Sequence, residues 1–205
     1  MMAAIMCGGK GSRMREFASI EKPLLKLKGQ TMVELVLNTL VKSEKFRRIV
    51  VATSYNALLT AAYIDANLSH EVDIIKTEGR SYSHDISMVL NILKPATVFV
   101  VPADLPLLEL KNVRETVSQW RQEDACISVL SAKQYVIGMG IKPSVIVRIN
   151  SRQYCHTGIS VIDSTKVYGT ARIAERYIIL NEKGVAVNVN TRSDFEAAER
   201  MMCRT

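Results

Sequence analysis

The sequence predicts a three-layer α/β/α fold in which a mainly parallel, mixed sheet lies between two layers of helices. Short runs rich in β-branched residues recur along the first half of the chain, as expected for strands that are buried on both faces. Helical patterns with one apolar face separate these runs. Such alternation is typical of a parallel sheet with right-handed crossover connections. The predicted strands are Ala3–Cys7, Ile49–Thr53, Val72–Ile75 and Thr97–Val101.

Two helices are predicted between these strands, a third follows them, and a fourth closes the chain. Thr31 and Glu34 form a capping box before the first helix, because each side chain can satisfy a backbone amide of the other's turn. Ser83 can cap the second helix. The third is expected over Asn112–Gln122, and the fourth over Thr191–Met202, with its first residue as the cap.

The pattern changes after Ala125, where strand-like segments follow one another with few helical faces. These segments are CISVLSA, YVIGMGI, SVIVRI and GISVID. They predict further mixed or antiparallel strands, whose order cannot be read from the sequence. A closing strand is expected over Val185–Val189. Because no linker or repeat divides the chain, we expect a single domain over residues 1–205.

Composition and charge narrow the class of protein. The chain has 205 residues, 48% of them apolar, and can bury a sizeable core. A net charge of +7 suits an anionic partner, but no aromatic interleaving or zinc-finger spacing accompanies it, so no nucleic-acid partner is expected. No apolar run approaches the ~18 residues of a membrane span, and the start of the chain lacks the pattern of a signal peptide. We therefore expect a cytoplasmic protein without a membrane span.

The most informative segment is CGGKGSRM, which begins at the end of the first predicted strand. Glycine lets backbone amides crowd around a bulky anion, and two cationic side chains follow at once. The Walker pattern GxxxxGK[ST] and the dinucleotide pattern GxGxxG are both absent, so the segment predicts a phosphate site of another design. A surface turn after an edge strand is the alternative. The candidate residues are Gly8, Gly9, Lys10, Gly11, Ser12 and Arg13.

The predicted sheet brings three loops to one rim. Ligands of parallel sheets bind beyond the carboxyl ends of the strands. The loops at that edge are Gly8–Lys22, the polar turn Thr53–Asn56 and the acidic turn Pro102–Pro106. We therefore expect the glycine-rich segment, the TSYN turn and the PADLP turn to face one another.

These segments resemble a known superfamily. IMCGGKGSRM followed by EKPLLKLKGQTMVE is similar to the signature of nucleotidyltransferases that include the molybdopterin guanylyltransferases, the sugar-phosphate nucleotidylyltransferases and the archaeal adenosylcobinamide-phosphate guanylyltransferases. PADLPLL resembles their acidic turn, and VNVNTRSDFEAAE resembles their closing strand and helix. The resemblance spans most of the chain. It implies a Rossmann-like nucleotidyltransferase fold, with a nucleotide-binding part over about residues 1–124 and an acceptor-binding part over about residues 125–205.

Within the superfamily, the archaeal cobinamide enzymes are the most similar. The pattern AxIMxGGKGxRM, the segment EKPLLKL and the chain length resemble theirs. The molybdopterin enzymes usually have a glycine where Arg15 stands, and the sugar-phosphate enzymes commonly run longer. The resemblance implies transfer of GMP from GTP to adenosylcobinamide phosphate with release of pyrophosphate, in the synthesis of cobalamin. Guanine selection rests on the resemblance alone.

Three other functions stay open. A sugar-phosphate nucleotidyltransferase and a molybdopterin nucleotidyltransferase share the signature. A non-catalytic nucleotide-binding protein could keep the glycine-rich segment, although the presence of both Lys22 and Asp104 counts against it. The oligomeric state is also open, and a homodimer is in keeping with such families.

The expected catalytic residues follow from the charge that nucleotidyl transfer builds on phosphate oxygens. Arg13 and Lys22 are expected to neutralise the triphosphate, and Asp104 to bind a Mg²⁺ ion that bridges the phosphates. The resemblance adds Asn188 and Asn190 as groups that reach the metal. For Lys22 the alternative is a surface lysine, and for Asp104 a carboxylate that braces its turn.

Contacts with the base and the ribose are expected from Thr53, Ser81, Tyr82 and Asp85, although Asp85 could serve only as a first-turn helix residue. The acceptor is expected beside the segment HTGISVID, where Gly158 would let a large corrinoid phosphate approach the backbone. An ordinary glycine at a strand edge is the alternative.

Overall fold

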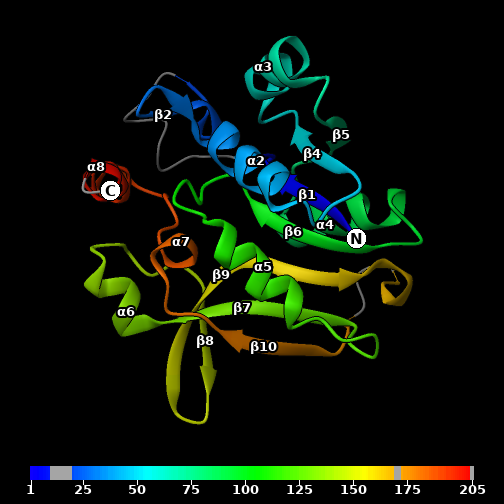
Figure 1. Ribbon diagram of the computed structural model, residues 1–205. Coiled ribbons are helices and arrows are strands. Elements are labelled where there is room, and N and C mark those ends of the chain that lie inside the picture. The colour runs from blue at the N-terminus through cyan, green and yellow to red at the C-terminus, as the bar shows by residue number, and fades with distance from the viewer. Residues whose placement is uncertain (10–19, 169–171, 204–205) are drawn as a thin grey trace.

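A computed structural model of the chain describes residues 1–9, 20–168 and 172–203. Its main sheet has eight strands, in the order β10-β7-β9-β6-β1-β4-β5 with β8 paired to β9 (Figure 1). These strands are β1 (Met2–Met6), β4 (Ile49–Ser54), β5 (Asp73–Thr77), β6 (Thr97–Pro102), β7 (Cys126–Ala132), β8 (Ile146–Ile149), β9 (Arg152–Asp163) and β10 (Glu175–Ile179). A small hairpin pairs β2 (Lys26–Leu27) with β3 (Gln30–Thr31).

The described helices connect these strands and close the chain. They are α2 (Met32–Ser43), α3 (Leu58–Leu68), α4 (Tyr82–Ile92), α5 (Leu110–Ser118), α6 (Lys133–Gly138), α7 (Lys183–Ala186) and α8 (Arg192–Cys203). Two short 3-10 helices are η1 (Lys22–Leu24) and η2 (Ser164–Lys166). No helix in the described ranges is long and apolar enough to cross a membrane.

The sheet is mainly parallel, as the sequence predicts. Strand β1 pairs in parallel with both β4 and β6, and β4 pairs in parallel with β5. The long strand β9 runs antiparallel to β6 and β7, and β10 returns in parallel beside β7. The antiparallel strand β9 therefore joins a parallel first half to a mixed second half.

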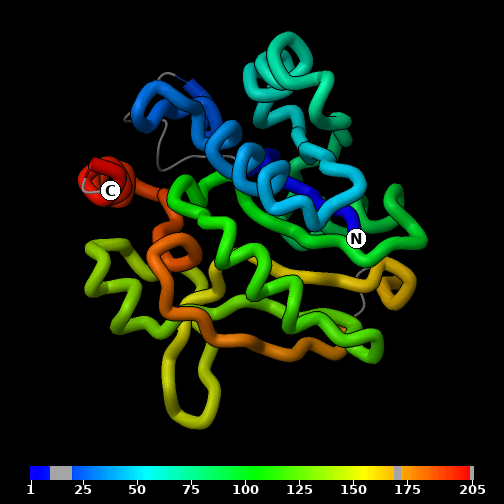
Figure 2. Tube along the Cα trace, in the orientation of Figure 1, coloured from blue at the N-terminus to red at the C-terminus, as the bar shows by residue number. Residues whose placement is uncertain are grey.

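Helices lie on both faces of the sheet because successive strand residues point to opposite sides. Ala3 and Ile5 of β1 belong to the core beneath α2, α3 and α5, whereas Ala4 and Met6 belong to the core beneath α4. A third apolar cluster packs α6 and α8 with the β2–β3 hairpin, and Figure 2 shows α8 beside that hairpin. The α/β/α layering confirms the predicted fold class.

The two faces are covered unequally. On the α4 side, β7 and β9 place Cys126 and Ile162 in the core. Further along the same face, β7 carries Ser128 and β9 carries Ser160, and both line a cavity together with residues of α4. The second half of the sheet therefore presents polar side chains to a hollow beside α4.

Several predicted elements agree with the structure. The capping box of Thr31 and Glu34 is formed in full at the start of α2. Thr191 caps the last helix, since its Oγ1 accepts a hydrogen bond of 3.3 Å from the amide of Asp194. The strand predicted over Val72–Ile75 is β5, which lies one to two residues further along the chain.

The structure corrects the predicted cap of the second helix. Helix α4 begins at Tyr82, and Ser81 is its cap, because the Ser81 hydroxyl accepts a hydrogen bond of 3.2 Å from the amide of His84. Ser83 therefore lies within the first turn, where its hydroxyl is 3.4 Å from that of Ser81.

Two predicted strands are wrong. YVIGMGI forms most of α6 and its terminal turn, which Gly140 closes with a φ of 73°. The run Val185–Val189 begins inside the short helix α7 and then continues without a strand ladder. Its alternating valines are buried against neighbouring elements. This alternation is the same apolar pattern that a strand would show.

Helix α3 was not predicted from the sequence. It buries Thr60, Ile64 and Leu68 but exposes its first two residues, Leu58 and Leu59. Because apolar side chains lie on both its buried and its exposed sides, the sequence shows no clear apolar face there.

The position of the α4 cap predicts a stability difference between two neighbouring serines. Replacing an N-cap serine by alanine typically costs about 1 kcal/mol, so Ser81→Ala should lower the free energy of unfolding by about that amount. Ser83→Ala is the matched control and should cost clearly less. Urea denaturation of both variants measures the difference, and a larger loss for Ser83→Ala would contradict the observed cap.

Candidate active site

The carboxyl ends of β1, β4 and β6 meet at one rim of the sheet. Gly8 follows β1, and its carbonyl oxygen accepts a hydrogen bond of 2.8 Å from the hydroxyl of Ser54 at the end of β4. Asp104 follows β6 on the other side of β1. The three loops expected to face one another are therefore brought together by the strand order.

An ion pair between Lys22 and Asp104 lies at the centre of this rim. Lys22 Nζ contacts Asp104 Oδ2, and the two side chains are only 16% and 13% exposed. Pro23 holds the chain in the first turn of η1 directly after the lysine. The pairing brings a cation from one end of the glycine-rich segment to the acidic turn after β6.

The second carboxylate oxygen of Asp104 differs from the one that pairs with Lys22. Its Oδ1 is buried and has no hydrogen-bond partner among the described residues. A buried carboxylate oxygen in this condition is costly unless a ligand or ion satisfies it. The site therefore has a free acceptor beside a paired cation.

The segment before α8 completes the rim. Lys22 Nζ lies 3.3 Å from Asn190 Oδ1, and Asn190 Nδ2 donates to Asn188 Oδ1 at 2.5 Å. Asp194 Oδ2 accepts hydrogen bonds from the amides of Asn190 and Thr191 at 3.0 and 2.8 Å. The cap of α8 thus fixes the backbone of Asn190 at the site.

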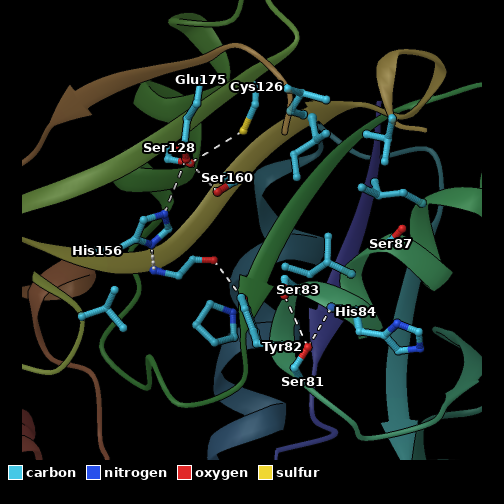
Figure 3. Close-up of a pocket in the computed structure, with 18 of the residues that line it drawn as sticks. Ser81, Tyr82, Ser83, His84, Ser87, Cys126, Ser128, His156, Ser160 and Glu175 are labelled. Carbon is cyan, nitrogen blue, oxygen red and sulfur yellow. Dashed lines mark hydrogen bonds and ion pairs between the residues drawn. The ribbon is translucent and has the colours of Figure 1, made fainter. Parts of the chain in front are cut away.

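A cavity of about 1100 Å³ extends from Asp104 and Asn190 across the polar half of the sheet. Ser81 and Tyr82 of the α4 start line one wall, and Ser128 and Glu175 line the floor further away. Figure 3 shows Ser128, Ser160, His156 and Glu175 gathered at one end of this cavity, across from the first turn of α4.

The distal end of the cavity is a connected hydrogen-bond cluster. Ser128 donates to Glu175 Oε1 at 2.5 Å, and Tyr177 donates to Glu175 Oε2 at 2.9 Å. The hydroxyls of Ser128 and Ser160 lie 2.8 Å apart. The imidazole of His156, together with the two hydroxyls, lowers the pKa of Glu175 to about 2, although burial acts in the opposite direction. Glu175 is therefore a carboxylate across the physiological pH range.

The ring of His156 is held by the backbone. The amide of Gly158 donates to His156 Nδ1 at 2.9 Å, so the proton of the neutral imidazole lies on Nε2, which is 3.8 Å from Glu175 Oε1. Ser128 reaches the carboxylate directly and not through the imidazole. This order differs from a hydrolytic triad, in which the imidazole lies between the serine and the acid.

Gly158 has a conformational reason to be glycine. Its φ is 87°, and a Cβ there would lie 2.8 Å from Cγ of Pro102. Its carbonyl accepts a hydrogen bond of 3.0 Å from the hydroxyl of Tyr82 across the cavity. A side chain at this position would push on the strand end that precedes Asp104, so the effect of a substitution would reach the rim. Contact with an acceptor stays a prediction.

The structure describes some of the other predicted site residues and not others. Lys10, Gly11, Ser12 and Arg13 lie outside the described residues, which include Gly8 and Gly9. Ser81, Tyr82, Asp104, Gly158 and Asn190 all line the cavity.

Thr53 and Asp85 are buried and make structural contacts near the rim. The backbone carbonyl of Thr53 accepts a hydrogen bond of 3.0 Å from the hydroxyl of Thr77. Asp85 Oδ1 accepts a hydrogen bond of 3.0 Å from the amide of Gly79. Neither residue is among those that line the cavity, and their contacts with a base or ribose stay predictions.

Cys7 lies beside the ion pair but is poorly suited to act as a nucleophile. Burial and then the charge of Asp104 raise the pKa of the Cys7 thiol well above its ordinary value. The thiol therefore stays protonated.

The polar cluster on β7, β9 and β10 was not predicted as a site. A signal was available in CISVLSA, where the serine at position 128 interrupts an apolar strand on the face that it shares with Cys126. Glu175 and Tyr177 belong to β10, a strand that was not predicted from the sequence. Their meeting with Ser128 depends on the parallel pairing of β10 with β7.

The fold and the rim together define a nucleotidyltransferase: a mixed α/β sheet with a paired lysine and aspartate beyond its parallel strands, next to a large cavity. Residues 3–159 match the MobA-like NTP transferase domain, and the chain belongs to that family.

The chain is similar to two guanylyltransferases along nearly its whole length. It is 29% identical over 204 residues to an adenosylcobinamide-phosphate guanylyltransferase of Methanocaldococcus jannaschii, covering 98% of this chain and 97% of the relative. It is 24% identical over 207 residues to a probable molybdenum cofactor guanylyltransferase of Natranaerobius thermophilus, covering 99% and 97%.

Solved structures share the fold at low sequence identity. CMP:2-keto-3-deoxy-manno-octonic acid synthetase, solved with CTP, superposes with a TM-score of 0.72 at 14% identity and covers 99% of this chain and 97% of its own. The 4-diphosphocytidyl-2C-methyl-D-erythritol synthase of Anaerococcus prevotii gives a TM-score of 0.69 at 13% identity, covering 99% and 96%. These likenesses support the Rossmann-like fold.

The lowered pKa of Glu175 predicts a pH-dependent contribution to stability. Its folded-state pKa of about 2 lies below the ordinary 4.5, so the charged form stabilises the fold above about pH 4.5, and this contribution is lost as the pH falls toward 2. Glu175→Gln should therefore be less stable than the parent at pH 7, by a margin that shrinks below pH 4.5. Urea denaturation across this range measures it, with Glu196→Gln as a surface control. A margin that stays constant on acidification would contradict the assigned charge.

Proposed function

We propose that the chain transfers GMP from GTP to adenosylcobinamide phosphate and releases pyrophosphate, as a step in corrinoid cofactor synthesis. The observation that carries the chemistry is the Lys22–Asp104 pair at the strand rim, beside a large cavity, with Asp104 Oδ1 unpartnered among the residues that the structure describes. The choice of acceptor and of guanine rests on the similarity to the archaeal relative, which extends over 97% of that protein.

The triphosphate binds at the rim. As the sequence predicts, the backbone amides of the glycine-rich segment bind its oxygens, from Gly8 and Gly9 to Lys10, Gly11 and Ser12, and Arg13 adds a cation; the last four lie outside the described residues. Lys22 turns from Asp104 to the phosphates as negative charge moves onto the leaving pyrophosphate. Because these groups stabilise charge and position the reactants, no covalent intermediate is needed.

Mg²⁺ fits the residues at this rim. Asp104 Oδ1 offers a buried carboxylate oxygen without a described partner, and Asn190 contributes an amide oxygen 3.3 Å from Lys22 Nζ. No cluster of three or more His, Cys, Asp or Glu residues suited to a metal occurs in the described part of the chain. That scarcity suits Mg²⁺, which commonly takes one or two carboxylates and completes its shell with substrate phosphates and water. When bound, the ion neutralises phosphate charge.

The acceptor occupies the cavity beyond the rim. A cavity of about 1100 Å³ is large for a small-molecule site, since such pockets commonly measure roughly 300–1,000 Å³. Its near end lies at Asp104, where the acceptor phosphate meets the nucleotide, and its far end carries the Glu175 cluster. Gly158 and Tyr82 line the cavity between these two ends.

Substrate identity is tested by a panel of nucleoside triphosphates against a panel of acceptors, scored by magnesium-dependent release of pyrophosphate. We expect GTP with adenosylcobinamide phosphate to give the highest kcat/KM. A preference for a sugar phosphate with another triphosphate, or for molybdopterin with GTP, would replace the proposed acceptor. Nucleotide binding without turnover on any acceptor would show a non-catalytic binding protein.

The roles of Asp104 and Lys22 predict two different losses. Asp104→Asn keeps the shape but removes the charge that attracts Mg²⁺, so activity should fall and the magnesium concentration for half-maximal rate should rise. Lys22→Met removes a cation that acts on the phosphates, so kcat should drop ~10²–10³-fold at every magnesium concentration. Titrations of rate against Mg²⁺ separate the two. Near-normal turnover in both variants would place the triphosphate elsewhere.

A further inference from the structure

Glu21 makes an unusual set of contacts immediately before the lysine of the rim. Its carboxylate accepts three hydrogen bonds from the first turn of α3. The amide of Leu59 donates to Oε1 at 2.9 Å, and the amide and hydroxyl of Thr60 donate to Oε2 at 2.7 and 2.6 Å. Both oxygens are used, so the side chain is held in one orientation.

The first turn of α3 has no side-chain cap from its own N-cap residue. Its N-cap is Ala57, which offers no side-chain acceptor to the free amides of the first turn. A carboxylate also interacts favourably with the positive end of the helix dipole. Glu21 supplies the hydrogen-bond acceptor and the negative charge, although it precedes Leu59 and Thr60 by 38 and 39 positions in the chain.

The backbone of Lys22 is confined on both sides. Glu21, fastened to α3, precedes it, and Pro23, with its restricted φ, follows it. The Glu21 carbonyl also accepts a hydrogen bond of 2.9 Å from the amide of Leu24, which closes η1. The long Lys22 side chain therefore starts from a fixed point when it reaches Asp104.

The end of β4, just before α3, holds the chain at Gly8. Ser54 donates its hydroxyl to the Gly8 carbonyl at 2.8 Å, and its own carbonyl accepts a hydrogen bond of 2.9 Å from the amide of Ala57, the cap of α3. Gly8 and Glu21 therefore attach to the end of β4 and to the first turn of α3, two consecutive elements of the chain.

We propose that Glu21 is a positioning residue: by fastening the chain to the first turn of α3, it holds Lys22 where the lysine acts on the phosphates. Glu21 itself does not touch the substrates. The inference rests on the proposed role of Lys22 and adds the residue that sets its position.

The kinetic test uses Glu21→Gln in the full chain, because glutamine keeps the shape but loses the charge and one acceptor oxygen. We expect kcat to fall by about tenfold, within the ~10²-fold that a misplacement of about 1 Å can cost, while the Kd for GTP changes little. Thr60→Val removes one of the three donors and should give a smaller loss in the same direction. Asp65→Asn, an exposed site on the same helix, is the matched charge control and should leave kcat unchanged.

A double-variant cycle separates positioning from general support. If Glu21 acts through Lys22, adding Glu21→Gln to Lys22→Met should cause no further loss of kcat. A full additional loss in that background, or an unchanged kcat for Glu21→Gln alone, would overturn the proposal. Should Glu21→Gln fail to fold, the same cycle with Thr60→Val decides.

A second readout does not depend on turnover. The lysines are reductively methylated with ¹³C, and the Lys22 signal is assigned in NMR spectra by its loss in Lys22→Arg. Glu21→Gln should move this signal toward its position in Asp104→Asn, where the ion pair is broken. A signal that stays in place would overturn the inference even if the chain proves active, and a shifted signal would support it even if the proposed acceptor proves wrong.

Discussion

The pairing of Lys22 with Asp104 is the interaction on which the site depends. It joins two segments that are far apart in the chain, the end of the glycine-rich segment and the turn after β6, and it lies largely out of solvent. Asp104 Oδ1 has no hydrogen-bond partner among the described residues, and in the proposed function Lys22 acts on phosphate while this oxygen binds an ion. Asp194 binds the backbone amide of Asn190, whose side chain contacts Lys22. Glu21, next to Lys22 in the chain, binds the first turn of α3.

The unequal covering of the sheet explains why the cavity lies next to that pair. Helix α4 covers the parallel strands on one face, but β7, β9 and β10 extend beyond it and place Ser128, Ser160 and Glu175 along the cavity. In the proposed function, the first half of the chain supplies the phosphate chemistry and the second half supplies a floor for a second substrate. Strand β9 joins the two, and Gly158 lies in it where the antiparallel strand passes the end of β6.

Local patterns predicted much of the fold, because the parallel strands and the α2 cap are encoded by neighbouring residues. The rim could be predicted as well, since strand ends of a parallel sheet must meet on one edge. The errors have a common cause. Apolar residues of Val185–Val189 and YVIGMGI pack against other elements of the fold, and their spacing resembles that of a strand. Helix α3 exposes two leucines in its first turn, so its sequence shows no single apolar face. The Glu175 cluster depends on β10 returning beside β7, and Glu21 depends on a helix that was not predicted. Pairings over such distances leave no local signal.

The central claim is that the nucleotide phosphates bind at the Lys22–Asp104 rim and the acceptor in the cavity beyond it. A crystal structure of the protein with Mg²⁺ and a non-hydrolysable GTP analogue tests this most directly. The account predicts phosphate oxygens in contact with Lys22 Nζ, the metal on Asp104 Oδ1, and an empty polar floor at Ser128 and Glu175. Phosphates bound at the Glu175 end, with the Lys22–Asp104 pair undisturbed and free of metal, would contradict it.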